Sequence, residues 1–168
     1  FESFRDLYCS LAISAAGRAA RVIMIASTGP REGKSIVAAN LARMCALHDE
    51  RTLLIDANLR RPVQHLGFNR SPERGLRTSS SNAEPLAALI HSEVEPRLDL
   101  LLTGSASAPP AEILGGRDFA QLLAQARTAY DRVVIDAAAL SAGETASLLA
   151  AMDACVFVAR YKQTRRKH

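Results

Sequence analysis

The residues best suited to chemistry lie in the stretch 27–35, STGPREGKS, which directly follows the apolar run VIMIA. Where a turn of small residues joins a strand to a helix, backbone N–H groups and the helix dipole favour a bound anion. Gly33 lets the backbone approach closely, Lys34 can reach the outer phosphates of a nucleotide, and Ser35 offers a hydroxyl to Mg²⁺. We therefore predict a phosphate-binding loop, although Thr28 replaces the first glycine of the strict pattern Gly-x4-Gly-Lys-Ser/Thr. The alternative is a glycine-containing turn with a solvent-exposed lysine.

Two aspartates end later apolar runs, LLID at Asp56 and VVID at Asp136. In open parallel sheets ligands bind beyond the carboxyl ends of the strands, so we expect both acids and the loop to converge on one edge. A carboxylate beside Mg²⁺ and phosphate can orient the metal or accept a proton from an attacking hydroxyl. Taken singly, each acid could instead cap a helix or form a turn.

The elements that would position these residues alternate between apolar runs and helical stretches. We predict helices over 1–16, 34–47, 85–91, 111–129 and 143–151, and strands over 21–26, 52–56, 98–103, 132–136 and 154–160. The strands are continuous apolar runs, which is typical of strands covered on both faces. With helices between them, the economical fold is α/β, with a mostly parallel sheet and helices on both faces. The polar, serine-rich stretch 70–84 is predicted to be a loop.

The length of 168 residues favours one domain with its own core. Within the domain 1–168 we expect an N-terminal helix over 1–17, a nucleotide-binding core over 21–160 and a basic tail over 161–168. Because the chain begins with Phe1 and not Met, we expect a piece of a longer protein. No apolar segment is long enough and free enough of charge to predict a membrane span.

Charge and composition exclude several other functions. The net charge of +4 permits an anionic partner without choosing one, and the low aromatic content of 5% with no recognition motif argues against nucleic acid. No Gly-x-Gly-x-x-Gly follows the first strand, which argues against a dinucleotide oxidoreductase. Cys9, Cys45 and Cys155 have no metal-ligand spacing, and we expect them to be buried thiols in a reducing compartment.

The motifs EGKSIVAANLA (32–42), LLIDANLRRP (53–62) and VVID (133–136) together resemble the bacterial tyrosine kinases of capsule and exopolysaccharide synthesis. These are P-loop proteins related to the MinD and ParA ATPases. The opening FESFRDLYCSL, and LDLLLTG followed by PPAEIL within 98–114, extend the resemblance over nearly the whole chain. It implies a P-loop NTPase-type α/β fold and an ATP-dependent protein-tyrosine kinase.

The resemblance also implies roles for individual residues. Lys34 and Ser35 would bind ATP with Mg²⁺, Asp56 would be the catalytic acid near the incoming tyrosine hydroxyl, and Arg60 would lie beside the active centre. The implied catalytic set is Asp56, Lys34 and Arg60. The implied nucleotide contacts are Gly29, Glu32, Gly33, Lys34, Ser35 and Ile36, and the implied metal ligands are Ser35, Asp56, Asn58 and Asp136.

The family's setting implies partners and a location. In that family the domain lies at the cytoplasmic face of the bacterial inner membrane. It follows, or partners with, a membrane polysaccharide co-polymerase that controls polymer chain length. It self-associates and phosphorylates a tyrosine-rich tail of a neighbouring subunit.

The sequence departs from the family pattern at four places. The second motif usually has two acids, but Asn58 stands in place of the second one, which predicts weaker Mg²⁺ binding. The third motif is usually followed by two prolines, but here alanines occupy 137–139. Tyr8 takes the third place of the pattern Glu-x-x-Arg-x-x-Arg that supports ring assembly, and Tyr161 is the only tyrosine near the end.

These departures keep alternative functions open. One is a catalytically weakened nucleotide-binding regulatory domain of the polysaccharide export machinery. Another is a MinD- or ParA-like ATPase, but those proteins carry an extra lysine early in the loop, where this chain has Gly29. The last is a structural domain whose loop has lost its function.

Overall fold

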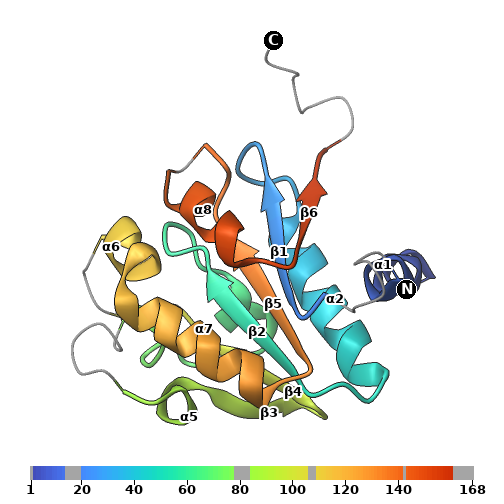
Figure 1. Cartoon of the computed structure of the whole chain (residues 1–168), viewed down its shortest axis with the longest axis horizontal. Coiled ribbons are helices and arrows are strands. Elements are labelled where there is room, and N and C mark those ends of the chain that lie inside the picture. Colours follow the sequence, from blue (N-terminus) through green and yellow to red (C-terminus); the bar gives the residue numbers. More distant parts are fainter. Residues whose placement is uncertain (1, 14–19, 78–83, 106–108, 142, 161–168) are drawn as a thin grey trace.

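The computed structural model describes residues 2–13, 20–77, 84–105, 109–141 and 143–160 (Figure 1). Within them, a six-stranded sheet has the strand order β3-β4-β2-β5-β1-β6. The strands are β1 (Val22–Ser27), β2 (Thr52–Ala57), β3 (His91–Glu95), β4 (Leu98–Leu101), β5 (Arg132–Ala137) and β6 (Ala154–Val158). β3 pairs antiparallel with β4, and the other neighbouring strands pair in parallel. The predicted mostly parallel sheet is confirmed.

Helices cover both faces of this sheet, as predicted (Figure 1). One face carries α2 (Lys34–Leu47), with α1 (Glu2–Ile13) packed against it. The other face carries α5 (Leu86–Leu89), α6 (Pro110–Gly115), α7 (Arg117–Ala129) and α8 (Gly143–Leu148). Since side chains alternate along a strand, β1 contributes Met24 to the core under α7 and Ile25 to the core under α2.

The central strands differ from the edge strands in burial. β1, β2 and β5 are buried at every position, which confirms the expectation that they are covered on both faces. On the edge strand β6 burial alternates, so Cys155 and Phe157 are exposed. Cys9 is also exposed, and only Cys45 is buried. The prediction of buried thiols is therefore wrong for two of the three cysteines, because β6 and α1 each leave one face uncovered.

The stretch 85–91 was predicted to be helical, but only Leu86–Leu89 is a helix and a strand begins at His91. This strand, β3, reads HSEVE and pairs only with β4 at the edge of the sheet. Edge strands carry polar side chains, so β3 has no apolar pattern that would have revealed it.

The helix predicted over 111–129 is two helices, because the chain becomes extended at Gly116 (φ −77°, ψ 161°). A Cβ at this position would lie 2.7 Å from the carbonyl oxygen of Glu112, so the tight turn requires glycine. The stretch 143–151 likewise divides into α8 and a 3₁₀ turn over Leu149–Ala151. A short helix, α3 (Gln64–Gly67), was not predicted.

Some predictions lie partly outside the described residues. The described part of the first helix ends at Ile13, and residues 14–17 are not described. The basic tail 161–168 and residues 78–83 of the predicted loop are also outside the described part. Among the helices that the structure describes, none combines the length and the apolar character needed to cross a membrane.

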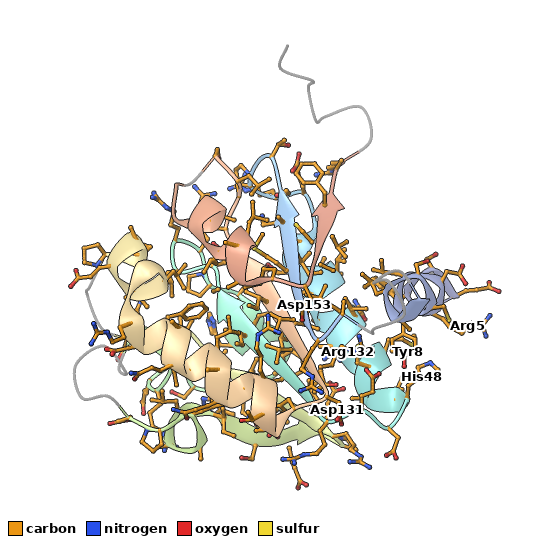
Figure 2. All side chains as sticks on the ribbon, viewed as in Figure 1. Arg5, Tyr8, His48, Asp131, Arg132 and Asp153 are labelled. Atoms are coloured by element: carbon orange, nitrogen blue, oxygen red, sulfur yellow. The ribbon has the colours of Figure 1, made fainter. Side chains whose placement is uncertain are left out.

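The amino ends of the strands are held by acids that bind neighbouring segments (Figure 2). Asp153 Oδ2 accepts hydrogen bonds from the backbone N–H of Arg21 (3.0 Å) and Val22 (2.7 Å). Its carboxylate also pairs with Arg127. Burial alone raises the pKa of Asp153, but Arg127 and the two N–H groups bring it below its usual value. Asp131 Oδ2 accepts a hydrogen bond from the N–H of Arg51 (2.9 Å).

α1 is fastened to the same end of the sheet by Tyr8 (Figure 2). Its hydroxyl donates to Glu50 (3.2 Å) and its ring stacks on His48, with 4.3 Å between ring centroids. Glu50 in turn forms an ion pair with Arg132 (2.7 Å), whose side chain is almost fully buried. Tyr8, at the third place of the family's helix pattern, therefore contacts the core of its own chain.

Candidate active site

The loop between β1 and α2 is shaped by a glycine at its end and by hydrogen bonds within it. Gly33, directly before α2, has φ 97°, a conformation that glycine adopts without cost. The Glu32 carboxylate accepts hydrogen bonds from the N–H of Gly29 (3.0 Å) and the hydroxyl of Thr28 (3.1 Å). Ser27 donates from its hydroxyl to the carbonyl of Gly29 (2.7 Å). The loop therefore holds its own shape before any ligand arrives.

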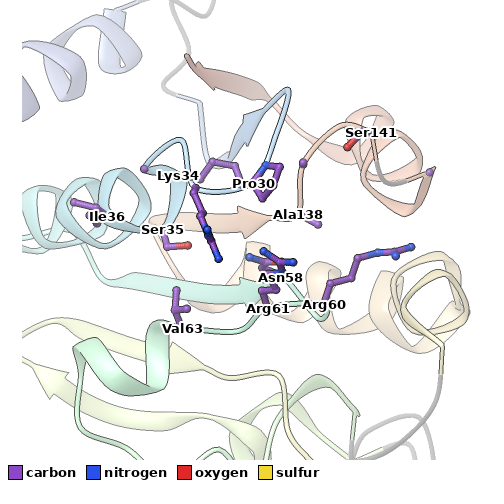
Figure 3. A pocket seen from close by; sticks show the side chains of 14 residues that line it. Pro30, Lys34, Ser35, Ile36, Asn58, Arg60, Arg61, Val63, Ala138 and Ser141 are labelled. Carbon is purple, nitrogen blue, oxygen red and sulfur yellow. The ribbon is translucent and has the colours of Figure 1, made fainter. Parts of the chain in front are cut away.

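A cavity of about 830 Å³ lies next to this loop (Figure 3). Its lining comes from three segments: the loop (30–36), the turn after β2 (58–63) and the turn after β5 (138–143). Figure 3 shows the Lys34 side chain extending from the start of α2 into this space. The volume suits a small-molecule ligand the size of a nucleotide.

The predicted site residues are divided between the cavity wall and the layer behind it. The lining includes the predicted residues Gly33, Lys34, Ser35, Ile36, Asn58 and Arg60. Gly29 and Glu32 are not among the lining residues and contact each other within the loop. Asp56 and Asp136 are fully buried at the ends of β2 and β5.

The two acids lie side by side, since Asp56 faces Asp136 in the register of the parallel strands β2 and β5. β1 pairs with the other side of β5, which places the loop next to Asp136, with Asp56 one strand further along the sheet. The predicted convergence on one edge of the sheet is confirmed. The chemical roles assigned to these residues stay predictions.

Asp56 is surrounded by backbone donors from the turn that follows β2. Its Oδ1 accepts from the N–H of Asn58 (3.2 Å), and its Oδ2 accepts from the N–H groups of Val63 (3.2 Å) and Gln64 (3.1 Å). Burial, and then the neighbouring charge of Asp136, raise the pKa of Asp56 to about 7 in spite of these bonds. An acid with this pKa can accept a proton near neutral pH.

The two carboxylate oxygens of Asp136 differ in their hydrogen bonds. Its Oδ2 accepts a hydrogen bond from the side-chain amide of Gln64 (2.8 Å). Its Oδ1 is buried and has no hydrogen-bond partner among the described residues. Burial raises the pKa of Asp136, while the Ser35 hydroxyl, the Gln64 amide and the charge of Lys34 act in the opposite direction.

The donor set fits a magnesium ion that comes with a nucleotide. The described residues contain no cluster of three or more His, Cys, Asp and Glu side chains that could hold a metal alone. Mg²⁺ usually takes one or two protein oxygens and completes its shell with water and phosphate. Asp136 Oδ1 is a buried oxygen without a hydrogen-bond partner among the described residues, and Ser35 and Asn58 line the cavity.

Gln64 is a site residue that the sequence did not reveal. It is 3% exposed, and its side chain bridges the carbonyl of Ser35 (2.9 Å) and Asp136. It stands eight residues after Asp56, beyond the strand end that drew attention to this region. The sequence stretch VQHLGF contains no signal that separates a buried glutamine from a solvated one.

No protein-family model matches the chain. Among curated proteins, it is 32% identical to the tyrosine-protein kinase Ptk of Acinetobacter johnsonii over 99% of this chain and 23% of that protein. It is 36% identical to the succinoglycan biosynthesis transport protein ExoP of Rhizobium meliloti (strain 1021), over 97% of this chain and 21% of ExoP. The chain thus spans less than a quarter of the length of these two relatives.

Solved kinase domains have the same fold. The kinase domain of the Escherichia coli tyrosine kinase Etk superposes with a TM-score of 0.91 at 29% identity, over 98% of this chain and 65% of that one. The VpsO kinase domain superposes with a TM-score of 0.84 at 30% identity, over 96% of this chain and 80% of that one. MinD of Pyrococcus horikoshii, solved with Mg-ADP, superposes with a TM-score of 0.69 at 19% identity, over 82% of this chain and 57% of that one. At this identity the comparison shows likeness of fold alone. The predicted P-loop NTPase-type fold is confirmed, and the chain belongs to the bacterial tyrosine kinases of capsule and exopolysaccharide synthesis.

Proposed function

We propose that the chain is an ATP-dependent protein-tyrosine kinase domain that regulates the polymerisation and export of an exopolysaccharide or capsule. The observation that carries this proposal is the cavity lined by the loop and Lys34, with two adjacent buried aspartates in the layer behind it. The names of the relatives support it, because Ptk is a tyrosine-protein kinase and ExoP serves succinoglycan biosynthesis and transport.

ATP would bind with its phosphates on the loop. The N–H groups at the start of α2 and the helix dipole favour the phosphate oxygens. Lys34 lies within the cavity and supplies a positive charge for the outer phosphates. Arg31, Arg60 and Arg61 are exposed at the rim and add positive charge. Gly29, Glu32 and Ile36 would complete the nucleotide contacts.

Mg²⁺, when bound, would neutralise charge on the transferring phosphate. Ser35 and Asp136 are the residues best placed to hold it, with Asp56 behind them. The Asn58 amide oxygen can add one contact, but it brings no negative charge. The metal is therefore expected to bind more weakly than at a site with two acids in the second motif.

Asp56 would act as the general base. Its raised pKa and its place at the carboxyl end of β2, next to Asp136, suit removal of a proton from a tyrosine hydroxyl. The tyrosine oxygen then forms a bond to the γ-phosphorus, the bond from that phosphorus to ADP breaks, and the proton resides on Asp56 until water removes it. Lys34 would stabilise the charge that moves onto the departing phosphate oxygens, and Arg60 would serve at the cavity rim.

A second candidate function is a nucleotide-binding regulatory domain that has lost phosphate transfer. It is favoured by Asn58, which lines the cavity where the family has a second acid. Such a domain would control the export machinery by assembling and dissociating with ATP.

Membership of this family also suggests how the domain is organised and which partners it has. We propose one domain over 1–168 at the cytoplasmic face of the inner membrane, working with a membrane polysaccharide co-polymerase segment or activator. Self-association would bring the tyrosine-rich tail of a neighbouring subunit to the cavity. No role for nucleic acid is proposed.

The decisive experiment measures phosphate transfer from γ-labelled ATP with Mg²⁺ to a tyrosine-rich acceptor peptide. Lys34→Ala is the control, because it removes a buried cation that lines the cavity. Label on tyrosine that disappears in the control supports the kinase. Nucleotide binding without label favours the regulatory function, and the absence of nucleotide binding overturns both.

A further inference from the structure

Gln64, the first residue of α3, has a buried polar side chain that the proposed phosphate transfer does not use. Its amide nitrogen donates to the carbonyl oxygen of Ser35 (2.9 Å) and to Asp136 Oδ2 (2.8 Å). A primary amide has two N–H donors, so both are accounted for by these two bonds.

The backbone of the same residue reaches the other acid. The N–H of Gln64 donates to Asp56 Oδ2 (3.1 Å), and the N–H of Val63 donates to the same oxygen (3.2 Å). Gln64 therefore contacts three elements of the site at once: the first turn of α2, the end of β5 and the end of β2.

These bonds fix how the Asp136 carboxylate is turned. With Oδ2 held by Gln64, rotation of the carboxylate would break a buried hydrogen bond. The fixed orientation leaves Oδ1 as the buried oxygen with no partner among the described residues. The same amide anchors Ser35, whose hydroxyl belongs to the predicted metal site.

We propose that Gln64 is a positioning residue, which orients Asp136 and ties it to Ser35 so that both present oxygen to one metal ion. This inference rests on the proposed function, because it assumes a magnesium nucleotide in the cavity. Residues that orient metal ligands in this way typically change metal affinity or activity by about 10- to 100-fold when they are replaced.

The test is Gln64→Met, which keeps a similar length and removes both donors. Calorimetry of ADP binding across a Mg²⁺ titration separates the metal from the nucleotide. We expect ADP affinity without Mg²⁺ to stay within about twofold, and the Mg²⁺ concentration for half-maximal tightening to rise about 10- to 100-fold.

Gln125→Met is the matched control. Gln125 lies on α7 and accepts a hydrogen bond from the N–H of Leu86 (3.0 Å), outside the cavity lining. The same chemical change there is expected to leave the Mg²⁺ dependence unaltered.

A double-mutant cycle distinguishes positioning from packing. If Gln64 acts through Asp136, then Gln64→Met added to Asp136→Asn shifts the Mg²⁺ dependence by less than about threefold further. Equal shifts in both backgrounds overturn the proposal. If the methionine variant does not fold, Gln64→Asn replaces it, because its shorter amide cannot span both acceptors, and the same shift is expected.

The outcomes separate the two proposals. A wild-type protein that responds to Mg²⁺, with a Gln64 variant that responds equally, overturns the positioning role and leaves the proposed function standing. A wild-type protein that binds no nucleotide overturns the proposed function and this inference together.

Discussion

The acidic side chains at the two ends of the sheet differ in how deeply they are buried and in which charged groups lie beside them. At the amino ends of the strands, Asp131, Asp153 and Glu50 accept bonds from neighbouring N–H groups or arginines. At the carboxyl ends, Asp56 and Asp136 are fully buried side by side, and the pKa of each is raised. The first arrangement links neighbouring segments of the fold, whereas the second places two buried carboxyl groups next to each other, which helps to raise the pKa of Asp56.

The difference follows from what each end has to satisfy. Asp153 and Asp131 bind N–H groups at or just before the first residues of β1 and β2. Asp56 and Asp136 lie under a cavity, and one oxygen of Asp136 has no described partner. Burying a carboxylate costs free energy, and the charge of Lys34 offsets only part of that cost for Asp136. We infer that the protein tolerates this cost because the site needs it for function.

Replacing one aspartate at each end of the sheet by asparagine is expected to give very different rates of phosphate transfer. Asp56→Asn removes the proposed base, so we expect phosphate transfer to fall about 10²- to 10⁴-fold while ADP still binds. Asp131→Asn weakens a bond to the N–H of Arg51 at the other end and is expected to leave transfer intact. Parallel assays with γ-labelled ATP measure both. Equal activity of Asp56→Asn and the wild type would remove Asp56 from the mechanism.

Breaking the ion pair at the amino end should affect the fold and not the chemistry. Arg132→Met leaves Glu50 without its partner and removes a guanidinium bond to the carbonyl of Ala20. Loss of one member of a buried pair destabilises by about 3 to 5 kcal/mol. We expect a fall in the denaturation midpoint in urea, with transfer per folded molecule unchanged. A variant as stable as the wild type would show that the pair contributes little.

Neutralising an acid at the carboxyl end of the strands should stabilise the fold, whereas Arg132→Met should destabilise it. Asp136→Asn removes the repulsion with Asp56, so without Mg²⁺ at pH 8 we expect stability to rise by on the order of 1 to 2 kcal/mol. For a domain of this size the melting temperature would rise by about 3 to 6 °C. Melting curves recorded with a chelator test this, and a lower melting temperature would contradict it.

The stability that Asp136→Asn adds should depend on pH. The folded pKa of Asp56 is about 7, above the ordinary value of 3.8, so the folded protein binds the proton more tightly than the unfolded chain. Stability from this proton is fully present below pH 3.8 and is lost as the pH rises through about 7. The advantage of Asp136→Asn should therefore be largest at pH 8 and small at pH 4.

The sequence predicted the parts of the molecule that depend on local pattern. Strong apolar runs located β1, β2 and β5, and the polar residues at their ends located the loop and both acids. The polar edge strand β3 was missed, because pairing with β4 and not burial makes it a strand. Gln64 was missed for a related reason, since its role depends on long-range contacts with Ser35 and Asp136.

At the carboxyl end of the strands, Asn58→Asp adds a third acid near Asp56 and Asp136. Asn58 lines the cavity and is only partly buried, so the new charge can reach the metal. We expect the Mg²⁺ requirement to fall about tenfold, equivalent to about 1.4 kcal/mol. In the absence of metal the same charge should lower stability, because it lies near Asp56, whose Oδ1 already accepts the N–H of residue 58. A metal titration and a melting curve with chelator measure the two effects. If neither changes, position 58 lies outside the metal's reach, and the weak second motif does not explain any lack of phosphate transfer.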